Sequence, residues 1–501
     1  MQSTYSDSRQ NPVHEWWRKI NVTFVPGQTD SLLEGAVSHL LDQFQRWGHN
    51  IQPAPQEDTD VILTTVPFGN AIGWREALLF TARRRFNLSH APVVFTLLHV
   101  SRDQFRDLLD RLSRILKKEP PDPGDYDFPG LAPDAYKTIF EQGRRGGSIL
   151  ALVRIVQTQA KSIRSILLIG EDQPEEAYTF DLVGAHPKTI AEDSDRFYED
   201  LMLRIVTAAS TKEVTNHEVI DEPVPQEVWK TLSTPHAMSV AGRELGKRAF
   251  FTEMVRVANL AQVPAVHEAV SSQYSEGCFA TWEPELGCLV ATVTGSARPV
   301  EKDNLTDDEL ALICGVRPGG IGALVRQVDG KRNDPPSSEA VELMELDEPL
   351  PRIWIQGKGG HTYEVPVARS KLHGHRGVKA YDPQFVEHVF LDAPYYQYPV
   401  SCSTEAQARA IRSAFSRSEA LNDPDDPRQV IFTVLPGHGI VIVEKWAPGK
   451  VPFQLMWEYM DEGRLQIENL VPQGSLRFVS GEDGMMILQT GDMALQEDPI
   501  E

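Results

Sequence analysis

An alternation of short apolar runs with segments of helical periodicity, in the first quarter of the chain, constrains the fold most. The runs are rich in β-branched residues, and two of them (DVILTTVP and APVVFTLLHV) are apolar on both faces, as in a parallel sheet. A strand–helix–strand order predicts a parallel sheet with helices on both faces. The expected strands are residues 19–26, 60–67 and 91–100. The expected helices are residues 31–47, 73–86 and 103–118.

A proline-rich, acidic stretch at residues 119–134 interrupts this pattern. It is either a domain linker or a loop over an active-site mouth, and we favour a loop within the α/β region. A second α/β set follows, with strands expected at 163–170 and 181–185. The helices expected in it are residues 136–158, 194–209, 225–232 and 241–260. Gly170 ends a strand but lacks the GxGxxG spacing of a dinucleotide site, so we expect a packing glycine.

From about residue 340 the pattern changes to short β-rich runs separated by Gly and Pro, which is typical of an antiparallel sheet or barrel. The clearest unit is VIFTVLPGHGIVIVEKW, a hairpin with its turn at 436–439, and one helix is expected at 404–420. The expected fold class is α/β: two Rossmann-like α/β domains with parallel sheets, followed by a β-rich C-terminal domain. We expect three domains, at residues 14–160, 161–340 and 341–492. We expect the two tails, residues 1–13 and 493–501, to be disordered.

Charge and cysteine content exclude several classes of function. The net charge of −22 opposes binding to a nucleic-acid backbone, and the one basic run, Arg83–Arg85, is expected on a solvated helix face. No apolar run is long enough for a membrane span. The four cysteines include no CxxC pair, so we expect small buried thiols in a reducing compartment and a cytoplasmic protein.

Polar residues follow the predicted parallel strands, at the edge where open α/β sheets bind ligands. They are Thr64, Thr65, His99, Glu171 and Asp172. His99 comes after an apolar run, and we expect it to be a hydrogen-bonded structural histidine rather than a catalytic one.

Residues 271–304 hold the strongest candidate site. Glu276 stands beside Gly277, an apolar run follows at 286–293, and a Thr-Gly turn leads to Glu301 and Asp303. A carboxylate before an apolar run can be a metal ligand or a general base with a raised pKa, although an exposed loop glutamate fits the same pattern. Just after this stretch, residues 306–309 have the pattern Thr-x-x-Glu, which predicts a helix capping box at Thr306.

Candidate imidazoles lie in the segment KLHGHRGVKAY. His373 and His375 are two residues apart, so on a strand they would share a face, and Arg376 beside them could bind a carboxylate or phosphate. Each could also be a surface-loop residue, and His361 and His438 in Gly-flanked turns are weaker candidates. Two carboxylates with an imidazole predict a Mn²⁺ or Mg²⁺ site.

The succession of two α/β domains and a β-rich domain resembles the architecture of the L-fucose isomerase and L-arabinose isomerase family. In that family a Glu-Gly/Ala-Asp segment leads through an apolar run to a Thr-Gly turn. The similar segment here begins at Glu276-Gly277 and reaches its turn at Thr294-Gly295, before Pro299 and Asn304. Cys278 stands where the family has the aspartate, and a thiol is a poor ligand for a hard metal ion.

The resemblance implies a metal-dependent aldose–ketose isomerase that works through an enediol with Mn²⁺ or another divalent cation. Glu276 would be the metal-binding acid/base, Asp303 the second catalytic ligand, and His375 (or His373) the imidazole ligand. The resemblance also implies a homo-oligomer. Apart from the resemblance, we expect His373, Arg376 and Tyr396 to contact the substrate. Tyr396 and its neighbours Tyr395 and Tyr398 could form an apolar ligand wall, although packing within the β-rich domain also fits them.

Two other hypotheses stay open. A non-catalytic carbohydrate- or small-molecule-binding protein on the same scaffold would keep the cleft but lack converged metal ligands. A transferase with a nucleotide-linked substrate would need a diphosphate at a helix N-terminus of the first domain, and the missing glycine fingerprint counts against it.

Overall fold

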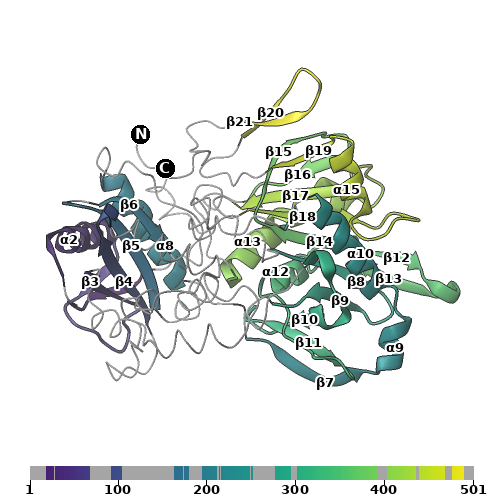
Figure 1. Cartoon of the computed structure of the whole chain (residues 1–501), viewed down its shortest axis with the longest axis horizontal. Helices are drawn as coiled ribbons and strands as arrows, with labels where there is room; N and C mark the ends of the chain where they lie inside the picture. The colour runs from purple at the N-terminus through teal and green to yellow at the C-terminus, as the bar shows by residue number, and fades with distance from the viewer. Residues whose placement is uncertain are drawn as a thin grey trace. The chain divides into compact units, whose positions relative to one another are not determined.

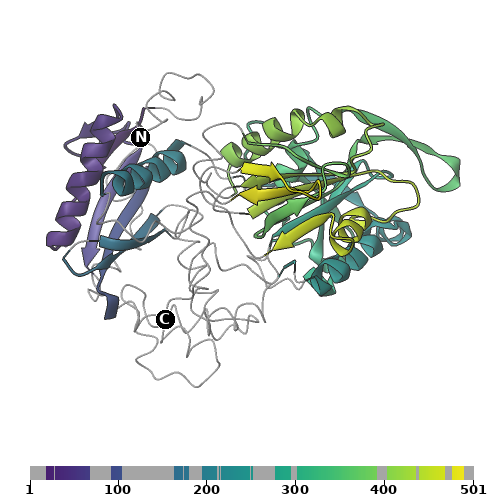
Figure 2. The same ribbon diagram turned by 90° about the horizontal axis from the view of Figure 1, so that it is seen from above.

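The computed structural model describes fourteen stretches of the chain. They are residues 19–27, 29–67, 92–103, 163–172, 174–179, 194–210, 214, 216–248, 250–251, 277–294, 302–391, 403–435, 439–468 and 477–489. These residues fall into two compact units, which Figures 1 and 2 show in two orientations. Unit 1 lies within residues 1–211, and unit 2 within residues 212–254 and 271–497.

Unit 1 contains a six-stranded sheet in the order β2-β1-β3-β4-β5-β6. The first five strands pair in parallel and β6 pairs antiparallel with β5. The strands are β1 (Asn21–Phe24), β2 (Asn50–Gln52), β3 (Val61–Pro67), β4 (Val93–Val100), β5 (Ile163–Gly170) and β6 (Pro174–Thr179). The parallel sheet predicted from the apolar runs is therefore confirmed. The expected strand at 181–185 and the helices at 73–86 and 136–158 lie outside the described residues, as does all but the first residue of the helix at 103–118.

Two helices are described in unit 1, α2 (Ser31–Arg46) and α8 (Ser194–Ser210), and they pack against each other. Asp30 caps α2 by accepting a hydrogen bond from the Leu33 amide. The second carboxylate oxygen of Asp30 lies 2.7 Å from Nδ1 of His99, and Nε2 of His99 lies 2.9 Å from the Gly170 carbonyl. His99 is thus hydrogen-bonded on both sides, as expected of a structural histidine.

Unit 2 is built on a nine-stranded mixed sheet in the order β16-β17-β18-β14-β8-β9-β10-β11-β7. Its strands are β7 (Glu218–Val224), β8 (Cys278–Glu283), β9 (Cys288–Thr292), β10 (Leu310–Val316), β11 (Ala323–Val328), β14 (Ala368–Gly374), β16 (Val386–His388), β17 (Val430–Leu435) and β18 (Gly439–Lys445). β14 lies between β8 and β18, so this sheet joins strands from both sides of residue 340. Both sheets cross the predicted domain boundaries. β5 and β6, which follow residue 160, complete the sheet of unit 1, and the nine-stranded sheet crosses residue 340.

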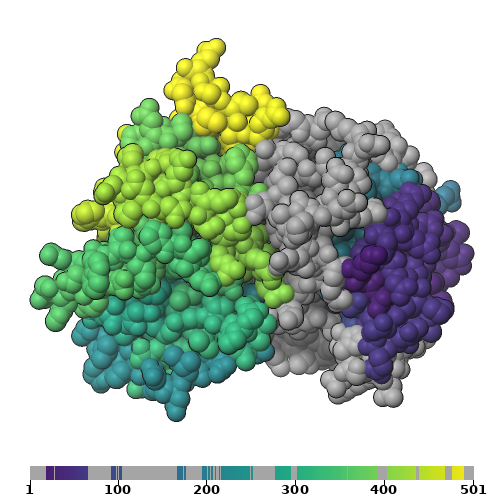
Figure 3. All heavy atoms as spheres, turned by 180° about the vertical axis from the view of Figure 1, so that it is seen from behind, coloured from purple at the N-terminus to yellow at the C-terminus, as the bar shows by residue number. Residues whose placement is uncertain are grey.

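Two smaller antiparallel sheets complete unit 2. β12 (Arg352–Gln356) and β13 (Thr362–Pro366) form a two-stranded hairpin that projects from the unit (Figures 1 and 2). The other sheet has the order β19-β15-β21-β20, and its β20–β21 hairpin is the yellow projection in Figures 1 and 3. Its strands are β15 (Gly377–Tyr381), β19 (Leu465–Glu468), β20 (Arg477–Ser480) and β21 (Met486–Gln489). These strands, and the pairing of β17 with β18, confirm the short β-rich runs predicted there.

Helices cover the nine-stranded sheet and position its polar residues. The described helices of unit 2 are α9 (Gln226–Thr231), α10 (Thr234–Lys247), α12 (Glu339–Glu345), α13 (Glu405–Ser416), α14 (Glu419–Asn422) and α15 (Gln454–Asp461). α12 contacts β8, β9, β10 and β14 on one side and α13 on the other. Gly242 brings α10 against the 3₁₀ turn η5 (Lys302–Asn304), because a Cβ there would lie 2.0 Å from the Lys302 carbonyl oxygen.

The cysteines correct one expectation. Cys288 and Cys314 form a disulfide between β9 and β10, whose register brings the two residues opposite each other, and only Cys278 of the described cysteines is a free buried thiol. The two strands are far apart in sequence, so their pairing was not visible in the cysteine spacing. Among the helices that the structure describes, none is both long and apolar enough to cross a membrane.

Candidate metal centre

Three potential metal ligands meet in unit 2. Glu339 is the first residue of α12, His373 is the penultimate residue of β14, and His375 follows the end of that strand. Each offers one ligand atom, and these three atoms all lie within 4.8 Å of one another. The sequence analysis expected one imidazole ligand, His375 or His373, and both histidines belong to this cluster.

The sheet register places His373 in the interior. β14 is flanked on both sides, and His373 is opposite Cys278 of β8 and Val441 of β18. Its Nδ1 lies 3.1 Å from the Ile440 carbonyl, which can only accept, so Nδ1 carries the hydrogen. The other ring nitrogen, Nε2, then presents its lone pair 3.8 Å from Oε1 of Glu339. A histidine fixed in this way through its second nitrogen is the usual arrangement for a metal ligand.

His375 lies beyond the end of β14, so the two imidazoles do not sit as neighbours on one strand face. Their rings meet edge to face, with centroids 5.1 Å apart and an interplanar angle of 72°. Gly277 allows the backbone just before β8 to lie close to the backbone of β14 at His373. Its φ is +70°, and a Cβ there would lie 2.1 Å from the His373 carbonyl oxygen, so the turn before β8 can pack against β14 only with glycine.

Burial sets the electrostatics of the centre. His373 is fully buried, His375 is 4% exposed and the Glu339 side chain is 14% exposed. Burial lowers the pKa of His373, although the charge of Glu339 and the Ile440 carbonyl oppose the shift, and Lys302 adds to it. The neutral imidazole, which is the ligating form, is therefore favoured.

Further polar side chains are buried beside the three ligands. Burial raises the pKa of the Cys278 thiol well above its usual value, and the charges of Glu339 and Glu342 add to this rise. Lys302, which is 4% exposed, opposes it. Cys278 and Lys302 lie near the two ends of the stretch 271–304. Both are therefore parts of that stretch that lie near Glu339, His373 and His375.

The structure assigns the carboxylate differently from the sequence. Asp303 is exposed on η5 and belongs to no group of converged ligands among the described residues. The reason is that η5 packs against Gly242 and Gly246 of α10, which turns Lys302 inward and Asp303 outward. Glu339 takes the carboxylate position instead. In the sequence it resembles an ordinary acidic residue in a first helical turn, so no local signal distinguished it.

The other predicted residues have mixed outcomes. Glu276, Tyr396 with its neighbours Tyr395 and Tyr398, and His438 lie outside the described residues. Nη1 of Arg376 donates to the Arg248 carbonyl at 3.1 Å. His361 is exposed in the β12–β13 connection. The capping box between Thr306 and Glu309 is confirmed.

The donor set fits a divalent transition-metal ion. Ligands that bind one ion at about 2.0–2.2 Å lie within roughly 4.4 Å of each other, close to the spread seen here. Two imidazoles and one carboxylate favour Mn²⁺, Fe²⁺, Co²⁺ or Zn²⁺ over Ca²⁺ and Mg²⁺, which prefer oxygen ligands alone.

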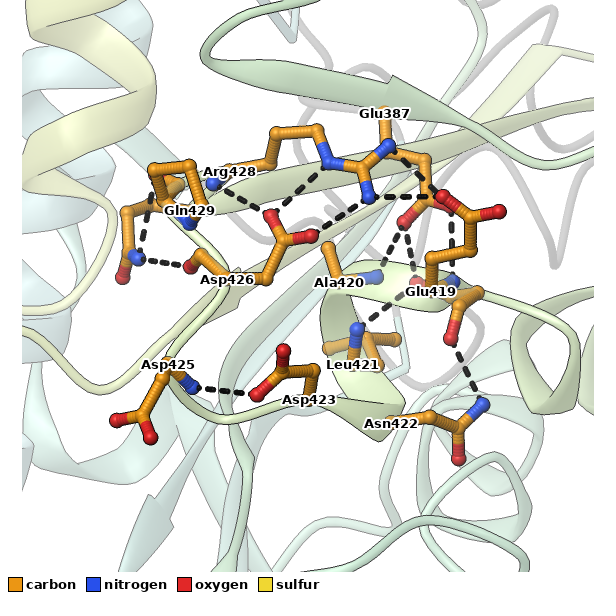
Figure 4. Close-up of polar contacts among 12 residues, drawn as sticks. Glu387, Glu419, Ala420, Leu421, Asn422, Asp423, Asp425, Asp426, Arg428 and Gln429 are labelled. Atoms are coloured by element: carbon orange, nitrogen blue, oxygen red, sulfur yellow. Dashed lines mark hydrogen bonds and ion pairs between the residues drawn. The ribbon is translucent and has the colours of Figure 1, made fainter.

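A second polar cluster lies at the edge strand β16. Glu387 accepts hydrogen bonds from the Ser418 hydroxyl and from the Glu419 and Ala420 amides, and Arg428 pairs with Asp426 and Glu419 (Figure 4). An open cavity of about 530 Å³ adjoins it, lined by Tyr381, His388, Phe390 and Arg417 among others. The charged groups of this cluster satisfy one another, so we interpret it as structural.

No protein-family model, curated protein or solved structure matches this chain.

Proposed function

We propose that this chain is a divalent-metal-dependent enzyme that interconverts an aldose and a ketose. The observation that carries the metal dependence is the convergence of Glu339, His373 and His375 within 4.8 Å in a buried environment. The isomerase reaction comes from the resemblance of residues 276–304 to the fucose and arabinose isomerase family. His375, the imidazole ligand that this resemblance implies, is one of the three converged residues.

The three ligands would hold the ion, and the surrounding residues would adapt the site to it. When bound, a divalent cation would supply Lewis acidity, which polarises the sugar's carbonyl oxygen and the neighbouring hydroxyl oxygen. The proton on the carbon next to the carbonyl group then becomes more acidic. The Ile440 carbonyl keeps His373 in the tautomer whose Nε2 can ligate. Cys278 and the two imidazoles are buried, and a low-polarity environment of this kind would strengthen electrostatic interactions at the site.

Among the fitting ions, Mn²⁺ is the one that the family resemblance favours. The two imidazoles are equally compatible with Fe²⁺, Co²⁺ or Zn²⁺, so the metal must be identified directly. Small sugars are the expected substrates, and a homo-oligomer remains the expected assembly.

The test begins with metal analysis of the purified protein and of the variants Glu339→Gln and His375→Gln. We expect about one transition-metal ion per chain in the wild type and loss of it in both variants, since each removes a ligand. Asp303→Asn and His361→Gln are matched controls, because both residues are exposed, and they should keep the metal. A hundredfold excess of metal over Kd should raise the free energy of unfolding by about 2.7 kcal/mol.

An aldose screen with the metal-loaded protein then tests the reaction. Deuterium from the solvent should enter the carbon next to the carbonyl during turnover, and Glu339→Gln should abolish this. If the purified protein binds no metal, or if Glu339→Gln and His375→Gln still bind it, the proposed metal centre is excluded.

The non-catalytic binding protein without metal ligands is not favoured by this convergence. A non-catalytic protein with a structural metal site is the competing function, and one observation favours it. The two imidazoles are almost completely buried, as in metal sites that stabilise a fold rather than open to substrate. In that case the protein would bind metal stoichiometrically and gain stability, but no aldose would be converted or exchange its proton.

A further inference from the structure

Glu342 lies one helical turn after Glu339 and is not one of the three ligands. Its side chain is completely buried, and Oε2 accepts a hydrogen bond of 2.9 Å from Nε2 of Gln407. Gln407 belongs to α13 and is 1% exposed. This contact links α12 to α13 across 65 residues of sequence.

The remaining oxygen of each side chain, Oε1 of Glu342 and Oε1 of Gln407, has no hydrogen-bond donor among the residues that the structure describes. A buried acceptor without a donor lowers the stability of the fold. Two such acceptors on one hydrogen-bonded pair of side chains are unusual. A carboxylate and an amide can form only one hydrogen bond of this kind. A protonated carboxyl can form two, because its O–H donates to the amide oxygen while the amide N–H donates back.

We propose that Glu342 is a neutral carboxylic acid joined to the Gln407 amide by two hydrogen bonds, and that this pair positions α12 so that Glu339 meets His373 and His375. The positioning half rests on the proposed metal centre, whereas the pair itself does not. Burial, followed by the negative charge of Glu339, raises the pKa of Glu342 well above its ordinary value, which agrees with a neutral acid.

The shape of α12 explains why such an anchor matters. The helix has seven residues, and Ser338 at its N-cap makes no side-chain capping bond. A helix this short is not stable by itself, so its orientation depends on tertiary contacts. A second link lies beside the pair, between the hydroxyls of Ser338 and Ser403 at 2.7 Å. The Glu342–Gln407 pair is thus a positioning contact for Glu339, not a catalytic one.

Infrared spectroscopy of the full chain tests the pair. The test uses a Glu444→Gln background, because burial raises the pKa of Glu444 to about 8 and this second carboxyl group would also be protonated at neutral pH. In that background the chain should show the C=O stretch of a protonated carboxyl group, and Glu342→Gln should remove it. Glu345→Gln is the matched control, because it makes the same change in the same helix at a half-buried position, and it should keep the band. If the Glu444→Gln chain lacks the band, or if the band in that background is unchanged by Glu342→Gln, the neutral acid is overturned.

Titration with Mn²⁺ or Zn²⁺ alone tests the positioning role. Gln407→Met removes both hydrogen bonds while keeping the length of the side chain. It should weaken metal binding by about tenfold, the lower end of the loss seen when a direct partner of a ligand is removed, because Gln407 holds the helix and not the ligand itself. Glu342→Gln should keep the wild-type affinity, because two amides can form the same pair without a proton. This rescue separates positioning from a general loss of fold, and circular dichroism checks that each variant folds.

Gln407→Met with unchanged affinity would overturn the positioning role. A wild-type protein that binds no metal would overturn the proposed centre and the positioning role together. In that case the infrared band still decides whether the acid–amide pair exists, so the two failures can be told apart.

Discussion

Acidification should destabilise unit 2 through His388, a half-buried histidine that also lines the cavity beside β16. Its ring stacks on Phe432 with centroids 4.7 Å apart, and the edges of Tyr381, Phe390 and Phe478 surround it. Both ring nitrogens are buried, and no described residue hydrogen-bonds to them. Burial lowers the pKa of His388 from 6.5 to about 3, and no neighbouring charge contributes.

The size of the effect follows from this shift. The unfolded chain takes up the proton near pH 6.5, whereas the folded chain resists it until about pH 3. Stability is therefore complete above the unfolded pKa and is lost as the pH falls from there toward the folded pKa. At about pH 5 the loss in the free energy of unfolding is about 2 kcal/mol, and it approaches 5 kcal/mol near pH 3.

Urea unfolding of the wild type and of His388→Phe measures this contribution. Phenylalanine keeps the aromatic packing but cannot be protonated. Between about pH 7.5 and pH 5, the wild type should lose about 2 kcal/mol more than the variant, read from midpoint and slope. His361→Phe, at an exposed histidine, should retain the wild-type pH dependence. Equal losses in wild type and His388→Phe would refute the reasoning.

Three further predictions concern single contacts of unit 2. Lys371 is fully buried and pairs with Asp347. Lys371→Met leaves the Asp347 charge unpaired and should lower the free energy of unfolding by about 3–5 kcal/mol, measured by chemical unfolding. The double variant Lys371→Met/Asp347→Leu should recover most of that loss. If the double variant is as unstable as the single one, the buried-charge explanation fails. Gly277→Ala should weaken metal binding and lower Tm, because the new Cβ would lie 2.1 Å from the His373 carbonyl; unchanged metal titration would contradict this. Burial raises the pKa of Glu444 from 4.5 to about 8, so its contribution to stability should fall as the pH rises from about 4.5 toward 8 and level off above that. Glu444→Gln should remove that slope in thermal melts.

Local sequence patterns determined much of the secondary structure. The apolar runs became β3, β4 and β5, the helical periodicities became α2 and α13, and the β17–β18 hairpin pairs as expected. Such patterns work because period and apolarity report how one segment is buried. The sequence also pointed to His373 and His375 as candidate imidazoles, and both belong to the candidate metal cluster, although His375 lies beyond the end of β14.

Tertiary structure alone decided the rest. Insertion of β14 between β8 and β18 brings His373 inside, and packing of α12 on those strands supplies Glu339 from a helix that looked ordinary. Likewise, η5 turns Asp303 outward, and the pairing of β9 with β10 joins Cys288 to Cys314. Periodicity shows that a face is buried but not which distant segment covers it, because that choice depends on long-range packing and pairing. A site assembled from several elements is therefore visible only in the folded chain.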